Sequence, residues 1–274
     1  MRVRTLRPLR AGEEITQSYV DLSASVFLRR EIIERDYFFK CVCVRCQDEM
    51  KELQEKAINK VDWLPKLEDA QHLLLELANN AVGLYNQTGM HMELGKLEAD
   101  AKKIISEPFP HGMWPDGMPP LASVHGIFAR ICTNNNDIAG ALRYSLKASL
   151  ALRERVGESW VHSLFDTIQI TSLVVSLPEQ HLIFKENNLF SKDDCWNILH
   201  GYLRELKLAA TYAFGSDSTY TRAIADWYSK AMFSLSPPHP GSPGFSAVYG
   251  ISEKRLLRWA GIEASRGVDI FVVV

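Results

Sequence analysis

The sequence lacks the features that would assign it to several common classes of protein. No apolar run among its 274 residues approaches the length of a membrane span. Arginines interrupt the N-terminal stretch in which a signal peptide needs an apolar core, at Arg2, Arg4, Arg7 and Arg10. The H-E-x-x-H pair, the G-x-S-x-G elbow and the phosphate-binding glycine loop are also missing. The sequence therefore gives no support for a membrane protein, a secreted protein, a hydrolase of these types or a P-loop protein.

An excess of charge of one sign is missing as well. The net charge is −2, and residues 1–46 hold nine Lys and Arg side chains against six Asp and Glu. Nucleic-acid binding needs a much denser basic face, so we expect no direct nucleic-acid partner. The five cysteines are too few and too unevenly spaced for a disulfide framework. We therefore expect a reducing compartment, the nucleus or the cytoplasm or both, with no secretion and no membrane partner.

Three of the cysteines lie together, at Cys41, Cys43 and Cys46. The C-x-C-x-x-C spacing lets a tight turn bring three thiolates to one tetrahedral ion, with Zn–S distances of about 2.3 Å. The alternative is a group of incidental thiols, but a cluster beside aromatic residues in a reducing compartment favours zinc. No fourth ligand is adjacent in the sequence. Candidates are solvent, Asp48 or Glu49, or a thiolate from another chain.

After Cys46 the hydrophobic pattern is that of helices almost throughout. Apolar residues recur at steps of three and four at Leu67, Ala70, Leu74, Leu77, Ala81 and Leu84, and again from Trp196 to Ala213. Further helices are predicted at about 26–35, 49–59, 91–106, 121–133, 137–156, 159–176, 216–233 and 252–265. Cys132 and Cys195 fall on apolar faces of these helices and are expected in the core.

Short turns join two pairs of these helices, 121–133 with 137–156 and 194–213 with 216–233, which predicts antiparallel pairs. Small residues recur beside aromatic ones in both, as in tetratricopeptide (TPR) repeats, although the consensus of about 34 residues is not cleanly met. The five prolines and two glycines of Pro108–Pro120 predict a surface loop anchored by Phe109 and Trp114, either a connector or a ligand-facing loop. A second break is predicted at Pro237–Pro243.

The two ends of the chain favour extended structure. Val3–Leu6 alternates with period two, and Glu14–Val20 is β-favouring after the turn-forming Ala11-Gly12, which together predict a hairpin. Its arginines indicate a solvated strand face or, alternatively, a contact to substrate. The apolar stretch Val268–Val274 has the pattern of an aggregation-prone strand, and no function is assigned to it.

The N-terminal motifs, taken in order, resemble one family. The run G-E-E-I-T-Q-S-Y-V-D over residues 12–21, an arginine-rich helix and Y-F-F-x-C-x-C-x-x-C over residues 37–46 are similar to the end of the SET domain and the post-SET zinc knuckle of SET- and MYND-containing (SMYD) protein-lysine methyltransferases. The resemblance implies that Tyr19 and Tyr37 line the catalytic lysine channel. It also implies that Phe39 packs against the adenine of S-adenosylmethionine, and that Cys41, Cys43 and Cys46 are three of the four zinc ligands.

Other elements of that family are missing from the sequence. It contains no glycine-rich cofactor segment, no MYND zinc finger and no Asn-His-Ser-Cys motif, which in the family contacts the cofactor and donates the fourth zinc ligand. We therefore expect the C-terminal part of a family member. The fold class expected is mostly α: a short β-hairpin remnant of a SET domain plus a post-SET zinc knuckle, followed by an antiparallel helical, TPR-like domain.

The predicted domain organisation has four parts. Residues 1–22 are the end of the SET domain, 23–48 the post-SET helix and cysteine knuckle, 49–234 the TPR-like helical domain and 235–274 an irregular C-terminal segment.

Two functions are compatible with these sequence features. The first is S-adenosylmethionine-dependent methylation of protein lysines such as those of histones, by a chain that we expect to be inactive alone. The second is a non-catalytic interaction module, in which the TPR-like helices bind a peptide or chaperone and the zinc-stapled SET remnant is a cap.

Overall fold

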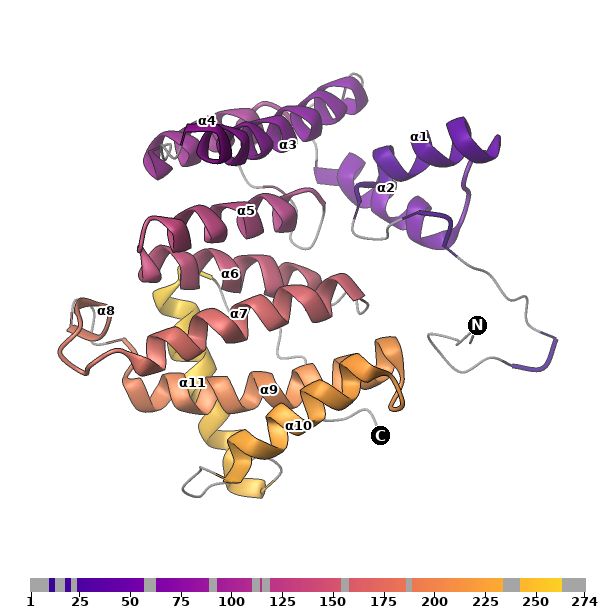
Figure 1. Ribbon diagram of the computed structural model, residues 1–274. Coiled ribbons are helices and arrows are strands. Elements are labelled where there is room, and N and C mark those ends of the chain that lie inside the picture. Colours follow the sequence, from indigo (N-terminus) through magenta and orange to yellow (C-terminus); the bar gives the residue numbers. More distant parts are fainter. Residues whose placement is uncertain are drawn as a thin grey trace. The chain divides into compact units, whose positions relative to one another are not determined.

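Helices make up the regular structure of the part of the chain that can be described. The computed structural model describes residues 10–12, 18–20, 24–56, 63–88, 93–109, 114, 119–153, 158–185, 189–233 and 242–262. Within these ranges there are eleven helices and no strand (Figure 1), which confirms the mostly-α prediction. The predicted hairpin falls largely outside the described residues, and the apolar C-terminal stretch falls wholly outside them.

The chain divides into two units, Met1–Ser163 and Leu164–Val274. The first contains α1 (Val26–Tyr37), α2 (Val44–Lys56), α3 (Trp63–Thr88), α4 (Leu94–Ser106), α5 (Leu121–Asn134) and α6 (Ile138–Arg153). The second contains α8 (Leu182–Lys185), α9 (Lys192–Phe214), α10 (Thr219–Phe233) and α11 (Pro243–Trp259), while α7 (Glu158–Ser176) crosses the boundary. None of the helices described is both long enough and apolar enough to cross a membrane.

In the first unit, α5 and α6 form a closely packed pair (Figure 1). Both carry apolar stripes, and Val124, Phe128 and Leu142 are buried. The chain reverses between the two helices at Asn136, which adopts a left-handed conformation with φ of 58°. Asp137 then accepts a hydrogen bond from the Gly140 backbone N–H at 2.9 Å, which satisfies one of the free donors at the start of α6. This helix pair agrees with the one predicted from the sequence.

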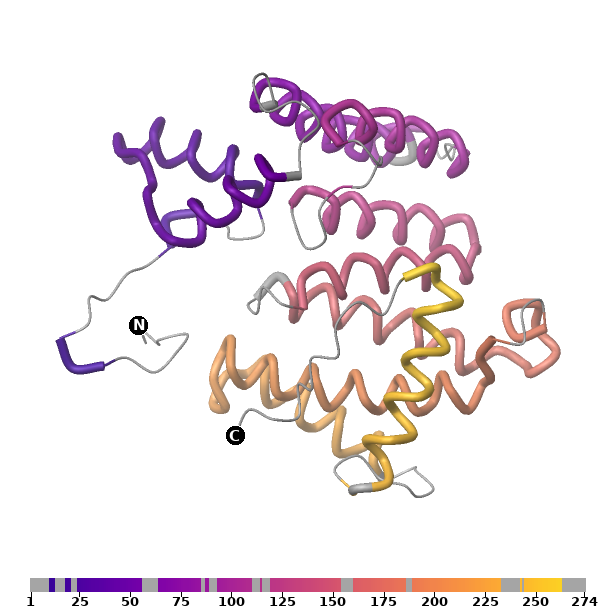
Figure 2. The backbone as a smooth tube through the Cα atoms, turned by 180° about the vertical axis from the view of Figure 1, so that it is seen from behind, coloured from indigo at the N-terminus to yellow at the C-terminus, as the bar shows by residue number. Residues whose placement is uncertain are grey.

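In the second unit, α9 packs against both α10 and α11, and α11 crosses α9 (Figure 2). The crossing is close at Gly201, where a Cβ atom would lie 2.2 Å from the ring of Tyr249. The hydroxyl of Tyr249 donates a hydrogen bond to the buried Glu205 at 2.7 Å. Glycine at position 201 therefore sets how closely the two helices approach.

A buried carboxylate joins the start of α9 to α11. Asp194 forms a capping box with Ser191, and it accepts a hydrogen bond from the Ser252 hydroxyl at 2.7 Å. Arg255 donates to the same carboxylate at 3.2 Å. Burial alone would raise the pKa of Asp194, but the hydrogen bonds from Ser191 and Ser252 and the charge of Arg255 outweigh it and lower the pKa.

Several boundaries differ from those predicted. Helix α11 begins at Pro243, inside the predicted break, because proline at the first helical position has a suitable φ and needs no N–H partner there. Helix α2 begins at Val44, so it includes Cys46, and the short α8 was not predicted. The proline-rich stretch has buried Phe109 and Trp114 in edge-to-face contact at 5.1 Å, as expected of its anchors. Cys132 and Cys195 are buried, as predicted.

We predict that Asp194→Asn lowers the stability of the second unit at pH 7 by about 2 kcal/mol, since it removes a buried charged acceptor. A carboxyl whose folded pKa is lowered stabilises the fold above its unfolded pKa, and this contribution is lost as pH falls through the lowered folded value. The difference between the variant and the unchanged chain should therefore be full at pH 7, begin to shrink near the ordinary aspartate pKa of 3.8, and vanish only below the lowered folded value. Urea unfolding followed by circular dichroism at several pH values measures it.

The matched control is Asp193→Asn, because Asp193 lies in the same first turn of α9 but is exposed. It should lose only a few tenths of a kcal/mol, the usual effect of an exposed charge near a helix terminus. Equal losses for the two variants would contradict the role given to the buried network.

Candidate functional site

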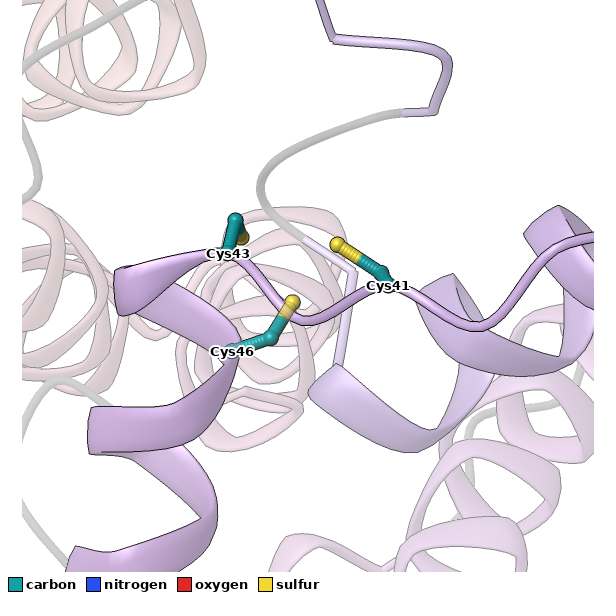
Figure 3. Close-up of side chains that lie close together, drawn as sticks. All are labelled: Cys41, Cys43 and Cys46. Atoms are coloured by element: carbon teal, nitrogen blue, oxygen red, sulfur yellow. The ribbon is translucent and has the colours of Figure 1, made fainter.

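The three clustered cysteines converge on one point. Cys41 and Cys43 lie in the link between α1 and α2, and Cys46 lies in the first turn of α2. Their three sulfur atoms are all within 4.8 Å of one another and point toward a common space (Figure 3). The sequence predicted a turn at this place. The structure instead uses two residues of a link and one residue of a helix to bring the sulfurs together.

The donor set and its spacing fit a zinc ion. Tetrahedral coordination with Zn–S bonds of about 2.3 Å places sulfurs about 3.8 Å apart, so only a small closure of the cluster would be needed. Among the residues described, the group consists of the three thiols alone. Of the proposed fourth ligands, Asp48 is exposed, and the Glu49 carboxylate accepts hydrogen bonds from Arg29 and Arg45 at 2.7 and 3.0 Å. The cluster could therefore hold zinc through three sulfurs and a ligand from elsewhere.

A buried arginine touches this cluster. The Arg29 side chain on α1 is 2% exposed, and it donates to Cys46 Sγ at 3.7 Å as well as to Glu49. Burial raises the pKa of the Cys46 thiol to about 11, although the Arg29 contact opposes that rise. Burial alone would raise the pKa of the Cys43 thiol. Hydrogen bonds from the Cys46 backbone N–H and the neighbouring thiols, together with the charge of Arg29, outweigh burial and lower this pKa. The thiols therefore differ in how readily they ionise.

The link between the helices starts with an unusual residue. Phe38 follows the last residue of α1 and has a left-handed conformation, with φ of 61° and ψ of 28°. This conformation ends the helix and turns the chain toward the cysteines, at a cost of about 1–2 kcal/mol for a residue with a Cβ atom. Its ring is 87% exposed. The sharp turn leaves Tyr37 on the helix and Phe39 beyond it.

The three aromatic residues predicted to line a pocket lie together. The ring centroid of Tyr19 is 4.8 Å from that of Tyr37 and 5.7 Å from that of Phe39, with tilted and edge-to-face geometry. The three side chains remain 46%, 44% and 42% exposed, respectively. Residues from two segments that are well separated in the sequence therefore form one aromatic group, and its surface is open to solvent. The roles that the resemblance gives to these residues stay predictions.

Arg29 and Glu49 are the residues of this site that the sequence patterns did not assign correctly. Glu49 was considered only as a metal ligand, and Arg29 only as part of an arginine-rich helix. One signal was present: Arg29 follows Val26 by three residues and precedes Ile33 by four, so it occupies the middle of an apolar helical stripe. A charged residue at such a position indicates a buried partner.

Comparisons with known proteins give partial matches of low to moderate identity. N-lysine methyltransferase SMYD2 of Bos taurus is 24% identical over 151 residues, which are 53% of this chain and 33% of that protein. Histone-lysine N-methyltransferase SET5 of Meyerozyma guilliermondii is 40% identical over 52 residues, 19% of this chain and 11% of that protein. Histone-lysine N-methyltransferase SMYD3 of Mus musculus is 38% identical over 50 residues, 18% of this chain and 12% of that protein. No protein-family model matches the chain.

These matches share one type of protein. The chain spans between 11% and 33% of the length of the curated relatives that it matches. All four relatives, the fourth being a SET and MYND domain-containing protein of Dictyostelium discoideum, carry SET, SMYD or SET and MYND in their names. The chain is therefore similar in sequence to the SET-domain and SMYD protein-lysine methyltransferases, and the resemblance carried by its N-terminal motifs is confirmed.

Proposed function

We propose that this chain contributes part of the lysine channel and the zinc knuckle of an S-adenosylmethionine-dependent protein-lysine methyltransferase. The observation that carries the proposal is the contact of Tyr19 with Tyr37 and Phe39, at 4.8 and 5.7 Å between ring centroids. These are the residues to which the resemblance gives channel and cofactor roles. Their side chains come from two separate segments, so local sequence alone does not bring them together.

The chemistry asks mainly for positioning. The cofactor supplies, when bound, an electrophilic methyl group on a sulfonium. The phenol hydroxyls of Tyr19 and Tyr37 would orient the lysine amine by hydrogen bonds, and the aromatic rings would exclude water from the amine. Phe39 is 42% exposed, which leaves a ring surface on which adenine could stack. Both tyrosines are also half-exposed, so a further surface would have to cover them during turnover.

The proposed substrates are lysine side chains of proteins, histones among them. Relatives of the chain are named as histone-lysine or N-lysine methyltransferases, which supports this substrate class. The proposed place of action is the nucleus, the cytoplasm or both. The proposed domain boundaries remain those predicted from the sequence, although α2 (Val44–Lys56) continues across the boundary at 48/49 and α11 (Pro243–Trp259) lies within the segment predicted to be irregular.

We also propose that Cys41, Cys43 and Cys46 hold zinc with a structural role. Three thiolates at this spacing suit zinc, which takes sulfur ligands in tetrahedral sites. The ion would fix the link between α1 and α2, which contains Phe39 and follows Tyr37 directly. Metal binding would in this way support the aromatic group.

A second candidate function is a non-catalytic interaction module. The half-exposure of all three aromatic rings favours it, because an open group does not exclude water as a methyl-transfer channel must. In that case the helical part of the chain would bind a peptide or chaperone through TPR-like pairs such as α5 with α6. Cofactor binding distinguishes the two functions.

We predict that the purified chain binds S-adenosylmethionine and that Phe39→Ala weakens binding by about 10–100-fold, the usual effect of removing an aromatic ring from a base stack. Isothermal titration calorimetry measures both affinities. Phe38→Ala is the matched control, since Phe38 is the neighbouring ring and is 87% exposed. Equal loss in both variants would contradict the role of Phe39. No binding by the unchanged chain would favour the interaction module.

Removal of one hydroxyl should separate positioning from cofactor binding. In a version of this protein that includes the cofactor-binding elements missing from this sequence, Tyr19→Phe is expected to lower methyl transfer to histone peptides at least 100-fold, because the amine loses an orienting hydrogen bond. It should leave the affinity for S-adenosylmethionine within about twofold. Transfer is followed with cofactor carrying a labelled methyl group. Tyr212→Phe on α9, an equally exposed tyrosine, serves as the control. Undiminished transfer by Tyr19→Phe would refute the channel assignment.

Elemental analysis should find about one zinc ion per chain, and Cys43→Ser should reduce this content to near zero, since two thiols alone bind zinc weakly. Cys195→Ala should keep the full zinc content, because Cys195 is buried in α9 and is not part of the cluster. An unchanged chain purified with zinc present but lacking the metal would refute the zinc proposal.

A further inference from the structure

The guanidinium of Arg29 makes three contacts from inside the first unit. Nη1 donates to the carbonyl oxygen of Ala24 at 2.5 Å. Nη2 donates to Glu49 at 2.7 Å and to Cys46 Sγ at 3.7 Å. The side chain is buried, and it lies against one member of the cysteine group rather than at the surface. Such contacts specify the position of a sulfur atom as well as joining two helices.

We propose that Arg29 is a positioning residue for the metal cluster: it holds the Cys46 sulfur through an N–H···S hydrogen bond and balances the charge of a three-thiolate site, while Glu49 holds Arg29. The inference rests on the proposed zinc site and extends it to residues outside the ligand set. Ligands of protein metal sites are commonly oriented by hydrogen bonds to neighbouring groups that do not bind the metal, as when a zinc-binding histidine donates its other N–H to a carboxylate. Here the order is carboxylate, guanidinium and thiolate.

The charges around the cluster support this role. Zinc with three thiolates carries a net charge of −1. The guanidinium of Arg29 places a positive charge against Cys46 and Glu49. This matters because Arg29, Glu49 and Cys46 are all buried, and an unpaired charge in such a place is costly.

The geometry also favours arginine over lysine at this position. The planar guanidinium offers several N–H donors in fixed directions, so it can serve Ala24, Glu49 and Cys46 at once. The single nitrogen of an ammonium group cannot occupy the positions of both Nη1 and Nη2. A hydrogen bond to a thiolate lowers the energy of its lone pair. This effect gives the proposal a spectroscopic signature besides metal affinity.

The test compares metal binding by the unchanged chain with that of two variants. Arg29→Met removes the sulfur contact and the positive charge. The double variant, Arg29→Met with Glu49→Met, removes the same contact together with the carboxylate, so that no Glu49 charge is left buried without Arg29. Zinc affinity is measured by competition with a chromophoric chelator, and the cobalt-substituted chains are examined by absorption spectroscopy. Arg35→Met is the matched control, because Arg35 lies on the same helix in an exposed ion pair with Asp36.

Both Arg29 variants should bind zinc about 10–100-fold more weakly, as is typical when a residue supporting a metal ligand is lost. Their sulfur-to-cobalt charge-transfer band should move to longer wavelength, because the thiolate lone pair rises in energy. Arg35→Met should keep its zinc affinity within about twofold and its spectrum unchanged.

Zinc affinity within twofold of the unchanged chain and an unshifted cobalt band, in either folded Arg29 variant, would overturn the inference. Loss of helical circular dichroism in both variants with zinc in excess would overturn it too, because Arg29 would then be a structural residue only. If the unchanged chain binds no zinc, the proposed zinc site itself is refuted. This outcome is distinct from a zinc-binding chain whose affinity does not depend on Arg29.

Discussion

The buried ion pair between Arg29 and Glu49 is the interaction on which the candidate site depends. Val26, Arg29 and Ile33 form the buried stripe of α1, and in α2 the stripe is Cys46, Glu49 and Leu53. Each stripe has the same spacing, with a charged residue in the middle. Removing one partner of a buried pair typically costs about 3–5 kcal/mol, because the other charge is left uncompensated. The two helices must therefore keep this register, and Cys46 is placed by it.

Much of the helical part could be predicted from the sequence, because its helices are amphipathic and have clear ends. The apolar stripe from Leu67 to Leu84 lies within α3, and the pair α5 and α6 was predicted within a few residues at each boundary. Periodicity alone was enough here, since packing of one apolar face determines where such helices run. The cysteine group and the aromatic group were predicted from motif order, and the structure brings the members of each together.

Other features could not be obtained from periodicity or motifs. The start of α2 was missed because C-x-C-x-x-C spacing suggests a turn, whereas the helix already includes Cys46. The start of α11 was missed because Pro243 was interpreted as a break, although proline is also compatible with a first helical position. The Arg29–Glu49 pair joins residues 20 positions apart. Such a pairing depends on how two helices meet, and neither helix alone specifies it.

The length of α1 has a mechanical consequence for the site. Arg29 and Tyr37 belong to the same helix and are eight residues apart, which corresponds to about 12 Å along its axis. An α-helix of this length transmits displacement as a rigid rod, because its backbone hydrogen bonds resist bending. A shift of the sulfur cluster that moves Arg29 would therefore tilt or slide the whole helix, and the Tyr37 ring at its end would leave the ring of Tyr19. Because Arg29 contacts the sulfur cluster near the beginning of α1, a movement of the cluster would be transmitted to the aromatic side chain at the other end of this helix.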